Sequence, residues 1–124
     1  MTAFKNQSFN RRLGFAVAGL LAGLRSEHSL RFQLIALIGV VVVLVAFHVE
    51  ASWWALVALT SSAVIAVELL NTAVEHLVDH LHPQAHPRIR VVKDLAAAAV
   101  LVAACGALAV AIALFVHVYT RLVK

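Results

Sequence analysis

The chain has 124 residues, of which 63% are hydrophobic and 13% charged, and its mean hydropathy is +0.95. This composition excludes an ordinary soluble domain and indicates a single integral membrane domain, residues 1–124. The formal charge of +4 does not indicate nucleic acid, because the basic residues form no patch with interleaved aromatic side chains. Membrane topology and anionic lipid explain these residues better.

The N-terminal segment predicts a helix on the membrane surface, over about residues 8–28. Its apolar stretch, LGFAVAGLLAGL, is too short to cross a bilayer. Charged residues flank this stretch on both sides, from Arg11 to Arg31. An amphipathic interfacial helix therefore fits the segment better than a cleaved signal peptide.

Two spans follow as a tight helical hairpin. Residues 32–49 and 51–67 lack Asp, Glu, Lys and Arg, and only Glu50 separates them. Each is close to the length of about 20 residues that crosses the hydrocarbon core. The second helix spans about 51–70 and should continue to about residue 81, because nothing interrupts its helical pattern before Pro83.

The third span is expected over about residues 92–120, after a short loop framed by Pro83 and Pro87. Most basic residues precede the first span or lie in this loop, whereas Arg121 and Lys124 follow the third span. Because positively charged segments tend to stay in the cytoplasm, the N-terminus and the 80–94 loop should be cytoplasmic and the C-terminus outside.

The segment VELLNTAVEHLVDH, residues 67–80, places a polar stripe at the end of the second span. On a helix, Glu68, Asn71, Glu75 and Asp79 fall within roughly 60° of one another. A solvated helix end is the simpler interpretation for one such residue. Four on one stripe, with Leu and Val on the other faces, indicate a functional site at the membrane surface.

Other charged groups can reach the same level of the membrane. Glu27 precedes the first span, and Lys93 and Asp94 open the third. Clustered carboxylates suit Mg²⁺, a Lys can contact phosphate, and a carboxylate can accept a proton. Together these are the components of phosphoryl transfer, although the chain has no glycine-rich nucleotide loop.

Two rival functions belong to other classes. His76, His80 and His82 form a cluster whose spacing could suit a transition metal, as in a small metal-binding transporter. A transporter predicts polar residues at the midplane of the membrane, where these spans carry few. A non-catalytic assembly subunit would leave the stripe at Glu68 unexplained.

Two segments carry a family resemblance. VELLNTAVEHLVD followed by HPRIRVVKDLAAAAVL resembles the signature of the prokaryotic diacylglycerol kinase family, E-[LI]-[LI]-N-[TS]-[AS]-[IV]-E and then a Lys-Asp pair before an Ala-rich helix. AGLLAGLRSEHSLRFQL also matches, and the similarity covers roughly residues 12–118. It implies an all-α membrane protein with a surface helix and three transmembrane helices per subunit. It also implies a homotrimer in the bacterial cytoplasmic membrane, with active sites at the cytoplasmic surface.

The resemblance further implies transfer of the γ-phosphoryl group of ATP to the primary hydroxyl of diacylglycerol, giving phosphatidic acid, with Mg²⁺. Glu68 matches the general base. Glu68 and Arg31 both match residues that contact the lipid. Glu27 and Glu75 match the metal ligands. The implied ATP contacts are Glu27, Asn71, Glu75, Gln84, His86, Lys93 and Asp94. The loop HPRIRVVKD looks closer to the undecaprenol kinase branch, so undecaprenol is the alternative acceptor.

Overall fold

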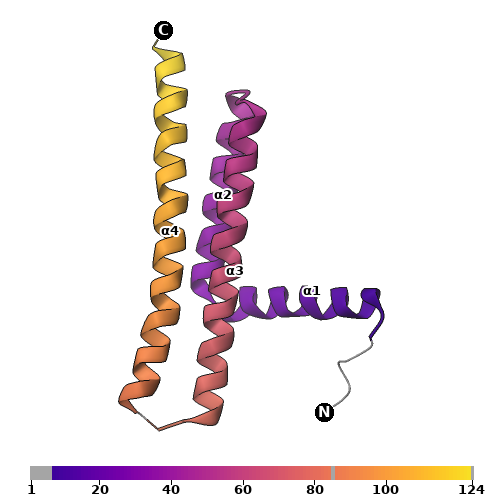
Figure 1. Cartoon of the computed structure of the whole chain (residues 1–124). Helices are drawn as coiled ribbons and strands as arrows, with labels where there is room; N and C mark the ends of the chain where they lie inside the picture. The colour runs from indigo at the N-terminus through magenta and orange to yellow at the C-terminus, as the bar shows by residue number, and fades with distance from the viewer. Residues whose placement is uncertain (1–6, 85, 124) are drawn as a thin grey trace.

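The computed structural model describes residues 7–84 and 86–123. This part of the chain folds into four helices: α1 (Phe9–Ser26), α2 (His28–Ala46), α3 (Ala51–Leu81) and α4 (Pro87–Leu122) (Figure 1). The all-helical class is as predicted, and α2, α3 and α4 are each long and apolar enough to cross a membrane. The expected orientation in the membrane depends partly on the charges of Lys5 and Lys124, and these two residues lie outside the described part of the chain.

The three long helices run side by side, and α1 projects crosswise from them (Figure 1). Beyond the level of α1, α3 and α4 continue without α2 beside them. We call this end, residues 68–94, the open end. The opposite end comprises the α2–α3 turn, the first turns of α3 and the last turns of α4, and we call it the closed end.

The junction between α1 and α2 is a single residue. Glu27 takes an extended conformation (φ −101°, ψ 120°), and its backbone N–H donates to the Gly23 carbonyl at 2.8 Å. Consequently α1 ends at Ser26 and α2 begins at His28, whereas we predicted about 28 and about 32. The prediction started the span after the last charged residue, where the hydrocarbon begins. The helix itself starts earlier, because His28 and Arg31 are compatible with helical backbone outside the hydrocarbon.

Gly23 is the closest approach of α1 to the bundle. A Cβ atom at this position would lie 2.8 Å from Leu69 Cδ2 and 3.1 Å from Leu30 Cδ1. Both distances are shorter than an ordinary van der Waals contact. The missing side chain therefore lets α1 rest against α2 and α3.

The α2–α3 turn is a Schellman motif. The Val49 N–H donates to the Leu44 carbonyl at 3.1 Å, and the His48 N–H donates to that of Val45 at 3.2 Å. His48 has a φ of 46°, in the left-handed region where glycine is usual. This turn ends α2 at Ala46, three residues before the predicted boundary, because the motif needs those residues outside the helix.

The start of α4 also differs from the prediction, at Pro87 instead of about 92. Pro87 occupies the first helical turn, where a missing N–H costs nothing. His86 caps the helix, because its Nδ1 accepts from the Arg88 N–H at 3.2 Å. The apolar run that guided the prediction starts later than the helix, whose first turn is polar.

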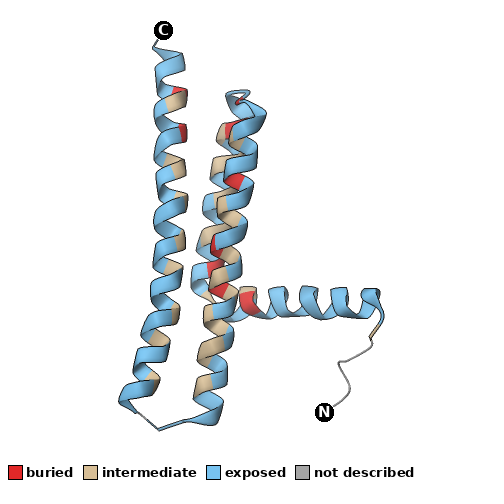
Figure 2. Ribbon diagram, in the orientation of Figure 1, coloured by how far each residue is buried: buried red, intermediate tan, exposed pale blue. Residues whose placement is uncertain are grey.

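The apolar core lies at the closed end. One cluster joins Leu44, Val49, Val57, Leu114 and Val118. Most of the other described residues are exposed (Figure 2). The accessible surface is 9501 Å², compared with about 6,500 Å² for a compact soluble protein of this mass.

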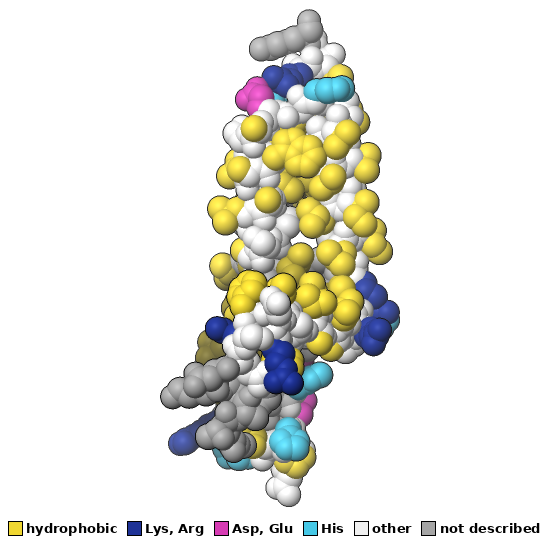
Figure 3. All heavy atoms as spheres, turned by 90° about the vertical axis from the view of Figure 1, so that its right-hand side faces the viewer, with side chains coloured by type: hydrophobic (Ala, Val, Ile, Leu, Met, Phe, Trp, Pro, Cys, Tyr) yellow, Lys and Arg dark blue, Asp and Glu magenta, His cyan; other side chains and the backbone are white. Residues whose placement is uncertain are grey.

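The exposed surface is itself apolar along the bundle. Figure 3 shows a hydrophobic band, with charged and histidine side chains gathered above and below it. An apolar surface with polar ends is what a lipid environment requires.

Candidate functional site

Among the described residues, Glu68 is the one charged residue that is buried, with 6% of its surface exposed. An ionised carboxylate out of water is costly unless it is hydrogen-bonded. It lies on α3 next to Leu69, the residue that approaches Gly23 of α1. The predicted stripe therefore begins with a carboxylate enclosed where α1, α2 and α3 meet.

Two side chains of α2 hold this carboxylate. The Ser29 hydroxyl donates to Glu68 Oε1, and Gln33 Nε2 donates to Glu68 Oε2 at 3.4 Å. Our sequence interpretation assigned neither residue to the site. Their spacing, i and i+4 on one helix face, was an available signal, but the sequence does not show that this face meets Glu68.

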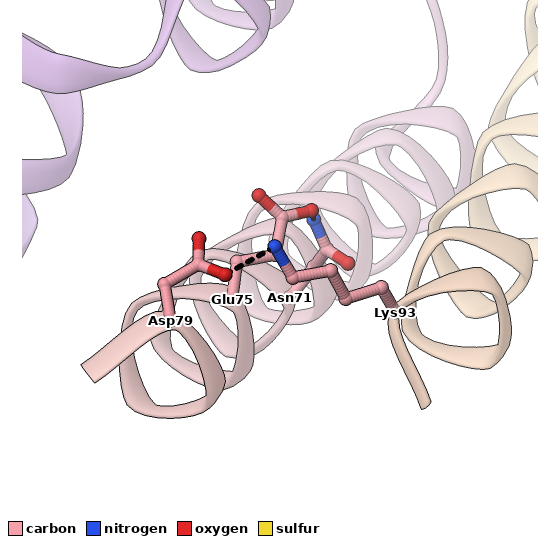
Figure 4. Close-up of polar contacts among 4 residues, drawn as sticks. All are labelled: Asn71, Glu75, Asp79 and Lys93. Atoms are coloured by element: carbon pink, nitrogen blue, oxygen red, sulfur yellow. Dashed lines mark hydrogen bonds and ion pairs between the residues drawn. The ribbon is translucent and has the colours of Figure 1, made fainter. Parts of the chain in front are cut away.

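Asn71 and Glu75 continue the stripe one and two turns further along α3. Asn71 Nδ2 donates to Glu75 Oε1 at 2.9 Å (Figure 4). Asn71 Oδ1 is buried and has no hydrogen-bond partner. A buried acceptor of this kind usually finds a partner, so the site is ready to accept a donor or a cation.

Lys93 brings α4 to the same stripe. Its Nζ lies 2.5 Å from Asp79 Oδ1, and Figure 4 shows the side chain extending from α4 towards α3. Asp94 does not follow it, because its carboxylate pairs with Arg90 Nε of the same helix at 3.8 Å. The structure therefore brings Lys93 to the stripe and leaves Asp94 on an exposed face.

The remaining predicted residues lie around this stripe. Glu27 is half-buried at the α1–α2 junction, and Arg31 is exposed. No ion pair joins these two within the described residues. Gln84 and His86 line a cavity of about 460 Å³ between the end of α3 and the start of α4, together with His82 and Arg88.

The donor atoms of the stripe suit a hard cation. Asn71 and Glu75 offer an unpartnered amide oxygen and a carboxylate side by side, and Mg²⁺ prefers oxygen ligands. Across residues 7–84 and 86–123, no three His, Cys, Asp or Glu side chains gather closely enough to form a metal site. The histidines of α3 and its loop therefore do not form the transition-metal cluster that the transporter alternative requires.

The fold and the site define a helical membrane protein with a hydrogen-bonded carboxylate, Glu68, at the point where the open end joins the rest of the bundle. Comparison with known proteins agrees with this class. The family model described as prokaryotic diacylglycerol kinase matches residues 14–115. The chain belongs to the prokaryotic diacylglycerol kinase family, as the two sequence segments predicted, and it is therefore an ATP-dependent lipid kinase.

Individual relatives include both branches of the family. The chain is 36% identical to a diacylglycerol kinase of Pseudomonas aeruginosa, over 81% of this chain and 85% of that protein. It is 37% identical to a diacylglycerol kinase of Synechocystis sp., over 77% of this chain and 55% of that protein. It is also 36% identical to an undecaprenol kinase of Bacillus subtilis, over 68% of each chain.

Proposed function

We propose that this chain transfers the γ-phosphoryl group of ATP to the primary hydroxyl of diacylglycerol, giving phosphatidic acid. The observation that carries the proposal is the enclosed, doubly hydrogen-bonded Glu68 in a member of a lipid kinase family. The relatives named diacylglycerol kinase match over more of this chain than the undecaprenol kinase does. Undecaprenol is the alternative acceptor, with the same chemistry.

Glu68 is the proposed general base. The acceptor hydroxyl gives its proton to the Glu68 carboxylate while its oxygen forms a bond to the γ-phosphorus. The bond from that phosphorus to the bridging oxygen breaks, and ADP leaves with the electron pair. The position of Glu68 supports this role, because it lies beside the contact between α1 and α3 and directly follows the apolar run of residues 51–67, where a lipid hydroxyl would lie.

Glu27, Asn71 and Glu75 are the proposed residues for the metal end of ATP. Mg²⁺, when bound, offsets the negative charge of the transferred group. Support comes from the oxygen donors of Asn71 and Glu75 and from Glu27, whose side chain makes no capping hydrogen bond at the α1–α2 junction. Since Mg²⁺ usually keeps waters and phosphate oxygens as ligands, a few protein carboxylates suffice.

The nucleotide is proposed to lie at the tip of the open end. Lys93 would contact its phosphates, with Gln84 and His86 nearby in the cavity at the α3–α4 loop. Asp94 would turn towards it from its exposed position. The lipid is proposed to contact Arg31 at the membrane surface and to enter a second cavity, of about 380 Å³, that Gln33 lines between α2, α3 and α4.

The active form is proposed to be a homotrimer in the bacterial cytoplasmic membrane, with the open end in the cytoplasm. The large exposed area of the single chain supports assembly, because its 9501 Å² exceeds by about 3,000 Å² the area that a compact protein of this mass exposes. The basic residues near α1 and in the α3–α4 loop support the orientation.

Phosphate transfer from labelled ATP tests this function. The purified full-length chain is assayed in mixed micelles with Mg²⁺, with diacylglycerol and undecaprenol offered in parallel. We expect labelled phosphatidic acid as the main product. A labelled polyprenyl phosphate alone would assign the chain to the alternative acceptor, and no labelled lipid from a folded chain would refute the kinase proposal.

A further inference from the structure

Glu68 accepts hydrogen bonds from two side chains, and the one from Gln33 is long. The Ser29 hydroxyl donates to Oε1, whereas Gln33 Nε2 lies 3.4 Å from Oε2, beyond the usual range for such a bond. Gln33 Oε1 is also buried without a partner. Oε1 therefore accepts the hydroxyl of Ser29, whereas Oε2 has a long contact beside an unpartnered acceptor.

We infer that Ser29 is a positioning residue for phosphoryl transfer, and that Glu68 Oε2 is the oxygen that takes the proton of the lipid hydroxyl. This inference rests on the proposed function. The Ser29 hydroxyl anchors Oε1 and so directs Oε2 towards the acceptor. Gln33 Nε2 gives up its long contact when the hydroxyl arrives, and Gln33 Oε1 remains available to the incoming group.

The fold gives Ser29 a defined position for this task. It is the second residue of α2, directly after the single-residue junction at Glu27. Its neighbour Leu30 is fully buried and lies beside Gly23 of α1. The docking of α1 therefore holds the backbone beside Ser29, which is itself exposed. A hydrogen bond to a charged group is worth more than one between neutral groups.

Steady-state kinetics of three variants test the role. Ser29→Ala should lower kcat about tenfold or more while the KM values for ATP and lipid change less than twofold. Ser29→Thr keeps the hydroxyl and should restore most of kcat. Ser62→Ala is the matched control, because the Ser62 hydroxyl donates only to the Leu59 carbonyl of its own helix, and it should behave as wild type.

Coupling to Glu68 separates positioning from a general structural effect. In the Glu68→Gln background, Ser29→Ala should lower the remaining activity less than twofold, because residues that act as a unit are not additive. An undiminished tenfold loss in that background would overturn the inference. So would unchanged kcat in Ser29→Ala, or failure of Ser29→Thr to recover it.

Infrared difference spectra supply a readout that needs no turnover. Subtracting the Glu68→Gln spectrum from that of wild type isolates the carboxylate bands of Glu68. Ser29→Ala should shift these bands and Ser62→Ala should not; an unshifted band would overturn the inference. If Ser29→Ala shifts these bands but the folded wild-type chain phosphorylates no lipid, the proposed function and the catalytic part of this inference are refuted, whereas the hydrogen bond is not.

Discussion

The two ends of the helical bundle differ both in the helices that form them and in the side chains that those helices carry. At the closed end, apolar side chains of all three helices pack together. The ring of Trp53 lies 5.2 Å from that of His117, and Arg121 Nη2 lies 2.9 Å from Glu50 Oε1. At the open end, α3 and α4 continue alone and carry carboxylates, an amide and a lysine.

This difference separates stability from activity. The apolar cluster at the closed end holds the helices in register through packing, which needs no precise polar geometry. The open end places a buried charge and an unpartnered amide oxygen together, which costs stability. Such a cost is expected where a site is built to bind substrates.

The largest effect should come from Glu68→Gln at the open end, compared with Glu50→Gln at the closed end. Loss of a general base typically costs about 10²–10⁴-fold in rate, so Glu68→Gln should lower kcat at least about a hundredfold. Glu50→Gln removes an exposed ion pair and should leave kcat within twofold. The check is phosphate transfer at saturating ATP and lipid, with circular dichroism showing that both variants fold.

The next effect concerns stability and should appear at the closed end. Leu114 is 3% exposed and Leu101 of the same helix is 64% exposed. Leu114→Ala should lower the free energy of unfolding by about 2–5 kcal/mol, and Leu101→Ala by much less. Unfolding in micelles, followed by circular dichroism, measures both. Equal losses would show that another surface covers Leu101 and that the closed end is not the main core.

A smaller effect should follow from Gly23→Ala, with Gly19→Ala as its control. A methyl group at 23 meets Leu69 and Leu30, whereas one at 19 has nothing within 4 Å. Both changes gain helix propensity, so their difference reports the clash, about 1–2 kcal/mol of unfolding free energy. Activity should fall in Gly23→Ala alone, because Leu30 and Leu69 adjoin Ser29 and Glu68. Equal unfolding free energies and equal activities of the two variants would show that α1 is not docked at Gly23.

The smallest effect should come from Asp79→Asn. The Lys93–Asp79 pair is partly exposed, with side chains 35% and 62% accessible, so its loss should change the unfolding free energy by less than about 1 kcal/mol. Freed from Asp79, Lys93 should bind the phosphates of ATP better, and the KM for ATP should fall by about two- to fivefold. A raised KM would instead make Asp79 part of the nucleotide site.

Much of the fold could be predicted because hydrophobic length identifies helices that cross a membrane. The helix ends could not, since local backbone motifs set them. The extended backbone of Glu27 separates α1 from α2, the left-handed backbone of His48 ends α2, and His86 caps α4. The charge pattern does not reveal these ends, because Glu27 lies before the apolar run begins, and His48 and His86 are not among the Asp, Glu, Lys and Arg residues that bound such runs.

The site was partly predictable for a similar reason. Helical periodicity alone places Glu68, Asn71 and Glu75 on one face, and the contact between Asn71 and Glu75 follows from it. The partners of Glu68 come from another helix, and one sequence carries no direct signal of that pairing. Lys93 and Asp94 were predicted as a pair, but adjacent residues on a helix point about 100° apart and here they take different partners.

Amide hydrogen exchange tests most directly the claim that substrates bind at the open end and not at the closed end. The folded chain in micelles is compared with and without ATP, Mg²⁺ and diacylglycerol, with exchange followed peptide by peptide. We predict that protection rises over residues 68–94 and stays unchanged over 44–57 and 110–118. Unchanged protection over 68–94, or a rise confined to the closed end, would contradict the claim that the open end binds substrates while the closed end stabilises the fold.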